Sequence, residues 1–264
     1  MRRAAEASLA RVRGEAASDP TKLEHVVAVM SELRGLGRSA EAVREGEQAR
    51  TLDSASGGLH YADRDEQLNW LHNELAYALY DVGRTQEARA AFEAAIAHGE
   101  KGRANVSQAI NFALSLTAEG EAARALEVLE RLGEMSVYGE MWAAAARACA
   151  HAQLGALTKR DEALGFLLQN EEENPHALIR GLLCADDRDA LASLFTRRLE
   201  RPDARAEMLG ALQRYRVTEA VPPPALAKLR DTLQRVRNDR NVAAAIDAVG
   251  RIEDVPLAAS VYSD

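Results

Sequence analysis

The stretch from Asn69 to Glu100 constrains the fold most strongly, because its apolar residues recur at helical spacing. In the first half they follow an i, i+4, i+7, i+8 pattern, which places them on one face of an α-helix. After a short break the second half shows the same periodicity. The stretch is therefore predicted to form two amphipathic helices. Their apolar positions are Leu71, Leu75, Ala78, Leu79 and Val82, then Ala88, Phe92, Ala95 and Ile96.

A tight turn at Gly83 and Arg84 separates the two helices. Glycine readily takes the left-handed backbone conformation that ends a helix. Thr85 is expected to cap the second helix with its side-chain oxygen. Asp63 and Glu66 precede the first helix with the three-residue spacing of a capping box. The sequence thus predicts an αα-hairpin with defined ends.

This hairpin resembles a tetratricopeptide repeat, a helix–turn–helix unit of about 34 residues with the pattern W-x2-L-G-x2-Y, A-x3-F and P. If Gly83 takes unit position 15, the sequence departs from that pattern at His72 and Glu100. Ala76 and Leu79 are tolerable replacements. The anchors that match are Leu75, Ala88, Phe92 and Ala95.

Weaker copies of the unit flank the hairpin, with Gly37, Gly120 and Gly155 at the same turn position. A less regular copy carries Ala190, Leu194 and Pro202. The resemblance implies an all-α fold: a right-handed α-solenoid of about five tetratricopeptide-like helix–turn–helix repeats over residues 22–202. Residues 1–21 are expected to form an N-terminal helix and lead-in, and residues 203–264 a C-terminal helical cap and tail.

The C-terminal segment is predicted to contain helices near residues 203–215, 224–238 and 241–250, with a break at the run of prolines from 222 to 224. The tail that follows has no clear pattern. Runs that alternate Val, Ile or Thr with polar residues do not occur, so strands are not expected.

Composition limits the class of function. The formal net charge of −8 argues against a general nucleic-acid binder. No run approaches the roughly 18–20 apolar residues that cross a bilayer, so membrane insertion is not expected. The N-terminus lacks the continuous apolar centre of a signal peptide, which favours a cytoplasmic protein, or a periplasmic one if a leader has been removed. Only four of the 33 basic residues are lysine, which suggests a bacterial source.

No motif for catalysis, a metal or a cofactor is recognisable. The histidines lack metal-ligand spacing, and two of them, His72 and His151, are expected to pack or to be partly exposed. Cys149 and Cys184 are expected to be reduced thiols within helices. The run from Glu171 to Glu173 follows a predicted helix end and is expected to be solvated.

By resemblance to the family, unit positions 2, 5, 6, 9, 12 and 13 line a concave groove that binds a peptide. Aromatic residues with polar tips dominate binding hot spots, and Asn side chains can both donate to and accept from an extended backbone. The acids in this set suit a ligand with basic and apolar groups. The candidate groove residues are Trp70, Asn73, Glu74, Tyr77, Tyr80, Asp81, Ser107, Ile110, Asn111, Leu114, Trp142 and Gln153.

The leading hypothesis is a non-catalytic scaffold that holds a protein or peptide partner in this groove. One alternative is a structural protein that self-associates through its convex face or its C-terminal helices, giving a homo-oligomer. Others are the sensor portion of a longer regulatory protein and an enzyme whose residues gather from separate loops. The last would require a deep pocket with strongly perturbed acids or histidines.

Overall fold

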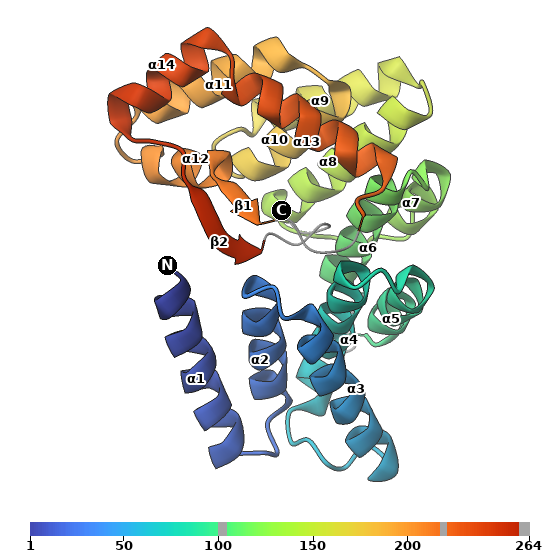
Figure 1. Cartoon of the computed structure of the whole chain (residues 1–264). Helices are drawn as coiled ribbons and strands as arrows, with labels where there is room; N and C mark the ends of the chain where they lie inside the picture. Colours follow the sequence, from blue (N-terminus) through green and yellow to red (C-terminus); the bar gives the residue numbers. More distant parts are fainter. Residues whose placement is uncertain (100–104, 217–220, 259–264) are drawn as a thin grey trace. The chain divides into compact units, whose positions relative to one another are not determined.

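The computed structural model describes residues 1–99, 105–216 and 221–258, which form fourteen helices and two short strands (Figure 1). The predicted anchor Glu100 and the end of the tail, residues 259–264, lie outside the described residues. The chain divides into two compact units. None of the described helices is both long and apolar enough to span a membrane.

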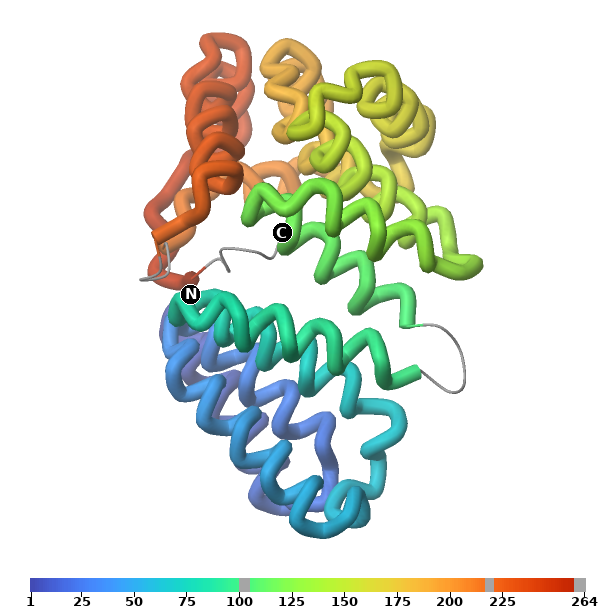
Figure 2. Tube along the Cα trace, turned by 90° about the vertical axis from the view of Figure 1, so that its right-hand side faces the viewer, coloured from blue at the N-terminus to red at the C-terminus, as the bar shows by residue number. Residues whose placement is uncertain are grey.

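Among the described residues, the first unit comprises 1–99 and 105–112 together with 215–216, 221 and 256–258. From α1 to α5 each helix contacts the next, and α2 also contacts α4. In Figure 2 these blue to teal helices run side by side. The helices are α1 (Arg2–Ser18), α2 (Leu23–Gly35), α3 (Ser39–Ala55), α4 (Arg64–Asp81), α5 (Thr85–Ala97) and the first half of α6 (Val106–Glu119).

The second unit comprises Ala113–Arg214 and Pro222–Val255. Here α8 contacts α7, α9 and α10, and α11 contacts α10, α12, α13 and α14. Besides the second half of α6, the helices are α7 (Ala122–Leu129), α8 (Val137–Gln153), α9 (Leu157–Gln169), α10 (Pro175–Ala185), α11 (Arg188–Glu200), α12 (Arg205–Leu212), α13 (Pro224–Arg237) and α14 (Arg240–Val249).

Six helix ends among the described residues share one geometry: five short helix-to-helix turns, and Gly57 (φ 65°) at the start of the longer loop between α3 and α4. At each, a residue with positive φ donates its N–H to the carbonyl three residues earlier, and the next residue donates five residues back. This pair of bonds is the Schellman motif, which satisfies carbonyls left open at a helix end. The turn residues are Gly37 (φ 73°), Gly83 (φ 78°), Gly120 (φ 88°), Gly155 (φ 70°) and Asp186 (φ 55°). The four turn glycines predicted from the sequence are thereby confirmed.

The predicted helix caps are wrong in two places. Thr85 is the first residue of α5 and makes no side-chain cap. The Asp63 carboxylate does not cap α4; it accepts hydrogen bonds from the backbone N–H of Leu23 (2.7 Å) and Glu24 (3.1 Å) at the start of α2. Asp63 therefore links two helix N-termini that are far apart in sequence.

Two short strands correct the expectation of a purely helical chain. Strand β1 (Arg214–Arg216) pairs with β2 (Asp254–Ala258), and the Arg214 guanidinium donates to the Asp254 carboxylate (2.7 Å). Residues 214 and 215 had been assigned to a helix, and β2 to an unpatterned tail. The partners are about 40 residues apart and mostly exposed, so neither strand carries the alternating apolar pattern of a half-buried sheet.

Candidate functional site

The residues predicted to line a groove fall into three groups by exposure. Asn73, Tyr77, Tyr80, Asp81 and Ile110 are buried. Ser107 and Gln153 are exposed. The remaining residues are half-buried: Trp70, Glu74, Asn111, Leu114 and Trp142.

A buried arginine engages the two predicted groove acids of α4. Arg34, on α2, donates to Glu74 (2.8 Å) and to Asp81 (3.2 Å). Its guanidinium also lies 4.7 Å from the centre of the Tyr77 ring, and Ser39 donates to Asp81 (3.0 Å). The carboxylates that were expected to face a basic ligand are therefore already paired within the first unit.

This arrangement fixes the charge of Arg34. Burial by itself lowers the pKa of Arg34, but the Glu74 and Asp81 carboxylates outweigh it, so the pKa lies above its ordinary value. Sequence analysis missed this residue, although a signal was present. With Gly37 at unit position 15, Arg34 falls at position 12, one of the positions that the resemblance assigns to the groove.

The predicted groove tyrosines belong to an aromatic cluster around Phe92. Tyr77 meets Phe92 edge-on with ring centres 5.2 Å apart, and Tyr80 lies 6.1 Å from the same ring. Phe112 stacks on Phe92 at 5.3 Å. Such aromatic pairs contribute about 0.5–1.5 kcal/mol each beyond their burial. Tyr77 and Tyr80 therefore have a stabilising role in the core.

Two predicted groove amides also make internal hydrogen bonds. Asn111 on α6 donates to Asn73 on α4 (3.0 Å), and the exposed Gln153 donates to the Thr117 carbonyl (2.7 Å). These bonds join neighbouring helices within each unit. A peptide backbone that bound these amides would have to replace them.

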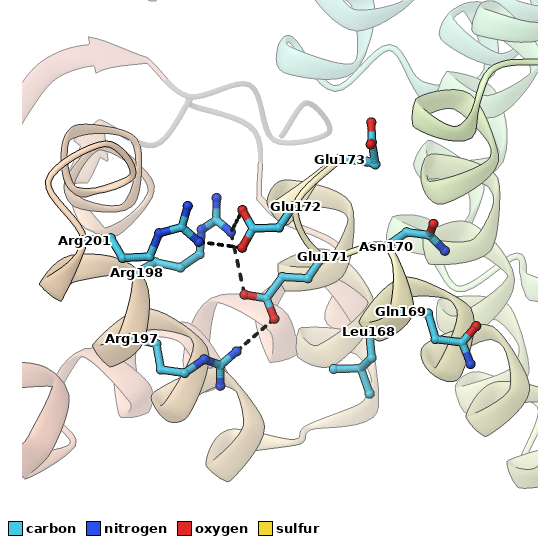
Figure 3. Close-up of a pocket in the computed structure, with 9 residues that line it drawn as sticks. All are labelled: Leu168, Gln169, Asn170, Glu171, Glu172, Glu173, Arg197, Arg198 and Arg201. Carbon is cyan, nitrogen blue, oxygen red and sulfur yellow. Dashed lines mark hydrogen bonds and ion pairs between the residues drawn. The ribbon is translucent and has the colours of Figure 1, made fainter.

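A cavity of about 570 Å³ lies in the second unit, between α11 and the turn that joins α9 to α10 (Figure 3). Arg197 on α11 pairs with Glu171 (2.8 Å). Arg201, one turn further along, pairs with Glu172 (2.5 Å) and with Asp203 (2.8 Å). Three arginines and three glutamates thus share one cavity lining.

The third arginine of the cluster, Arg198, is buried. It lies 3.3 Å from Glu172, 3.6 Å from Glu171 and 3.7 Å from Glu207, and of these only the contact with Glu172 is a hydrogen bond. Its Nε has no hydrogen-bond partner among the described residues. The neighbouring carboxylates balance the charge of the guanidinium, but they do not satisfy all of its N–H donors.

The expectation of a solvated acidic run holds in part. Glu172 and Glu173 are exposed, but Glu171 is half-buried and pairs with Arg197 of α11, and Glu172 pairs with Arg201, the residue after α11. The glutamates lie about 26 residues before the arginines. In the sequence, the available signal for this cluster was the spacing of Arg197 and Arg201 at i and i+4. Such spacing does not reveal which segment of the chain packs against the arginines.

A second cavity, of about 480 Å³, lies against α8 and α9. Its lining includes Met135, Phe166, His151 and Lys159. Partial burial lowers the pKa of His151, and the nearby charges of Lys159 and Arg147 lower it further. The cavity combines apolar walls with basic groups, and Glu140 and Glu162 also line it.

The two cysteines are not free thiols. Cys149 on α8 and Cys184 on α10 form a disulfide, with their Cα atoms 4.8 Å apart. Their separation of 35 residues is close to one repeat unit, so two packed helices bring equivalent faces together. Spacing alone does not show such a pairing, because it depends on the contact between α8 and α10.

Comparisons with known proteins assign no family to this arrangement. No protein-family model, curated protein or solved structure matches the chain. Within the described residues, no group of three or more His, Cys, Asp or Glu side chains is placed to hold a metal ion. The class supported by the structure is a helical protein whose consecutive helices pack on one another.

Proposed function

We propose that this protein is a non-catalytic scaffold that binds a segment of another protein, built as a right-handed tetratricopeptide-like solenoid. The five Schellman turns support a repeated hairpin unit. Contacts between alternate helices, α2 with α4 and α8 with α10, are the kind that stack such units within each half of the chain.

The observation that carries the proposal is the exposure of the two tryptophans. Trp70 and Trp142 occupy the same unit position and are both half-buried, while Tyr77 and Tyr80 are core residues. A large aromatic ring that keeps one accessible face is typical of binding hot spots. Binding surfaces are therefore assigned separately, to Trp70 with its half-exposed neighbours in the first unit and to Trp142 with its own in the second.

Peptide display on the full-length chain tests this function. Enriched peptides should bind with an affinity that falls at least about tenfold in Trp70→Ala or Trp142→Ala, the loss expected of a hot spot. Tyr215→Ala is the matched control, because Tyr215 is an exposed aromatic residue of β1, outside the predicted surface. Circular dichroism should show unchanged helicity. Failure to enrich any peptide, or equal loss in the control, would argue against the function.

A second candidate function is self-association through the α8–α9 hairpin. Four of its apolar side chains, Tyr138, Leu154, Leu157 and Leu168, are each more than half exposed. Single exposed apolar residues are ordinary, but Leu154 and Leu157 lie three residues apart at the turn between the two helices, and adjacent exposed apolar residues are a feature of interfaces. Sedimentation velocity over a range of concentrations would detect an oligomer, which Leu154→Ser and Leu157→Ser together should dissociate.

The disulfide bears on location. Disulfides persist in oxidising compartments and are rare in the cytoplasm. The Cys149–Cys184 bond therefore supports the periplasmic alternative over the cytoplasmic one. Fractionation of the source cells, with thiols trapped at lysis, would test this placement.

A further inference from the structure

The arginine cluster of α11 has more hydrogen-bonding capacity than its present partners use. A guanidinium carries five N–H donors. Arg198 is 5% exposed, makes one hydrogen bond of 3.3 Å to a side chain, and keeps Nε without a partner among the described residues. A buried donor that lacks a partner is unfavourable, and its usual explanation is a bound water or ligand. Arg198 lines the cavity of about 570 Å³.

The two glutamates that pair with the arginines differ in exposure. Glu171 is 19% exposed at its side chain and bridges Arg197 and Arg198. Glu172 is 63% exposed and contacts Arg198 and Arg201. Glu171 is therefore a fixed support of the cluster, whereas Glu172 can turn into solvent by rotation of its own side chain. Asp203, which also pairs with Arg201, is equally free to leave (69% exposed).

Charge decides what can replace Glu172. A ligand carboxylate carries the same single charge as Glu172, but it is not tethered to the chain beside the arginines. Its binding in place of Glu172 would therefore gain no free energy. A phosphate monoester carries close to two charges and three strong acceptor oxygens. It can accept from several guanidinium groups at once, and arginine forks match its geometry.

The size and lining of the cavity fit an organic phosphate. A volume of about 570 Å³ lies within the range of small-molecule sites and far exceeds one phosphate group. Leu168 adds an apolar wall, with Gln169 and Asn170 beside it. Glu173 also belongs to the lining, but Figure 3 shows its side chain directed away from the arginines.

We propose that the cavity formed by Arg197, Arg198 and Arg201 binds a phosphate monoester, and that Glu172 is an internal competitor that the phosphate displaces. This inference rests on the proposed binding function and specifies the chemistry of one ligand. The phosphate can belong to a phosphorylated protein segment or to a small phosphate compound.

Isothermal titration of the full chain separates these sources. The probes are inorganic phosphate, the peptide Ac-Ala-Ala-pSer-Ala-Ala-NH2 and its unphosphorylated form. We expect the phosphorylated peptide to bind and the unphosphorylated one not to bind. Phosphopeptide binding that is stronger than phosphate binding identifies a protein segment, whereas equal binding identifies a small phosphate compound. If neither phosphorylated probe binds to the wild type or to Glu172→Gln, the proposal is overturned.

Three variants test the site itself. Glu172→Gln removes the competing charge and keeps the shape, so it should tighten binding about fivefold or more. Arg201→Gln should weaken binding about tenfold or more. Arg235→Gln is the control, because Arg235 is an exposed arginine of α13 paired only with the exposed Asp231 in the described ion pairs. Equal losses in Arg201→Gln and Arg235→Gln would mean non-specific attraction and would overturn the proposal.

These results are separable from those of the tryptophan variants. If peptides selected by display still require Trp70 or Trp142 while no phosphate probe binds, the phosphate site is refuted and the scaffold function stands. If phosphate binds through Arg201 while no displayed peptide is enriched, the scaffold function fails and the site is retained for a small phosphate compound.

Discussion

Arg34 on α2 donates a 2.8 Å hydrogen bond to Glu74 on α4, and through this contact a residue of one helical hairpin neutralises an acid of the next. The same guanidinium reaches Asp81, whose side chain is almost completely buried (1% exposed). Replacement of Arg34 would remove a charged partner of a buried carboxylate, which is among the most destabilising of single changes.

Arg34→Ala should therefore lower the free energy of unfolding by about 3–5 kcal/mol. Urea denaturation followed by circular dichroism measures the change. The matched control is Arg11→Ala, which removes an exposed pair with Glu15 and should change stability by about 0.5 kcal/mol or less. Similar effects of the two variants would mean that the buried pair is not important for the fold.

The Cys149–Cys184 bond closes a loop of 35 residues between α8 and α10. Cross-linking over this distance restricts the unfolded chain and is expected to stabilise the protein by about 3–4 kcal/mol. Thermal unfolding should therefore shift to lower temperature in the presence of a reductant. The variant with both cysteines replaced by alanine should be insensitive to the reductant. Detection of two free thiols in protein denatured without a reductant would contradict the prediction.

His72 predicts a pH dependence of stability. Burial lowers its pKa from 6.5 to about 4, with smaller contributions from Arg50 and His98, and its Nδ1 has no hydrogen-bond partner among the described residues. The unfolded chain therefore binds a proton below pH 6.5 that the folded chain does not bind until pH is near 4. Stability should fall as pH falls through this window, by about 3 kcal/mol in total.

His72→Leu removes the titrating group and leaves an apolar side chain at a position where large packing residues are typical. Its free energy of unfolding should vary less between pH 4 and 6.5 than that of the wild type. His176→Gln, which removes a partly exposed histidine beside Glu207, is the control. If the free energy of unfolding of the two variants depends on pH in the same way, the pH dependence does not arise from His72.

Gly181 on α10 permits close packing against α9. A Cβ atom there would lie 2.6 Å from Leu167 Cδ1 and 3.2 Å from Leu164 Cδ2, and Leu167 is fully buried. Gly181→Ala should destabilise the protein by about 1–2 kcal/mol, because overpacking outweighs the gain in helix propensity.

Gly165 on α9 is the matched control, since a Cβ atom at that position has no neighbour within 4 Å. Gly165→Ala should stabilise the protein by about 0.5–1 kcal/mol through the same gain in propensity. Chemical denaturation measures the free energy of unfolding of both variants and so tests both predictions. Stabilisation by both substitutions would show that α10 and α9 have room to separate.

Local features of the sequence predicted most of the secondary structure. Apolar periodicity and the left-handed preference of glycine act over a few residues, so α4, α5 and the turn at Gly83 were recognisable without knowledge of any partner. The same reasoning placed the turns at Gly37, Gly120 and Gly155. At the equivalent turn after α10 the chain carries Asp186, and there the pattern gave no comparable signal.

The features of the candidate sites depend on contacts between distant residues. Asp63 caps a helix 40 residues away, Arg34 binds acids on another helix, and Arg201 meets Glu172 although α10 and α11 lie between them in the sequence. A residue's own spacing shows which face of its helix it occupies, but not which helix packs there. For this reason periodicity determined the helices and their turns, whereas the ion pairs, the disulfide and the arginine cavity arose only when packing brought separate helices together.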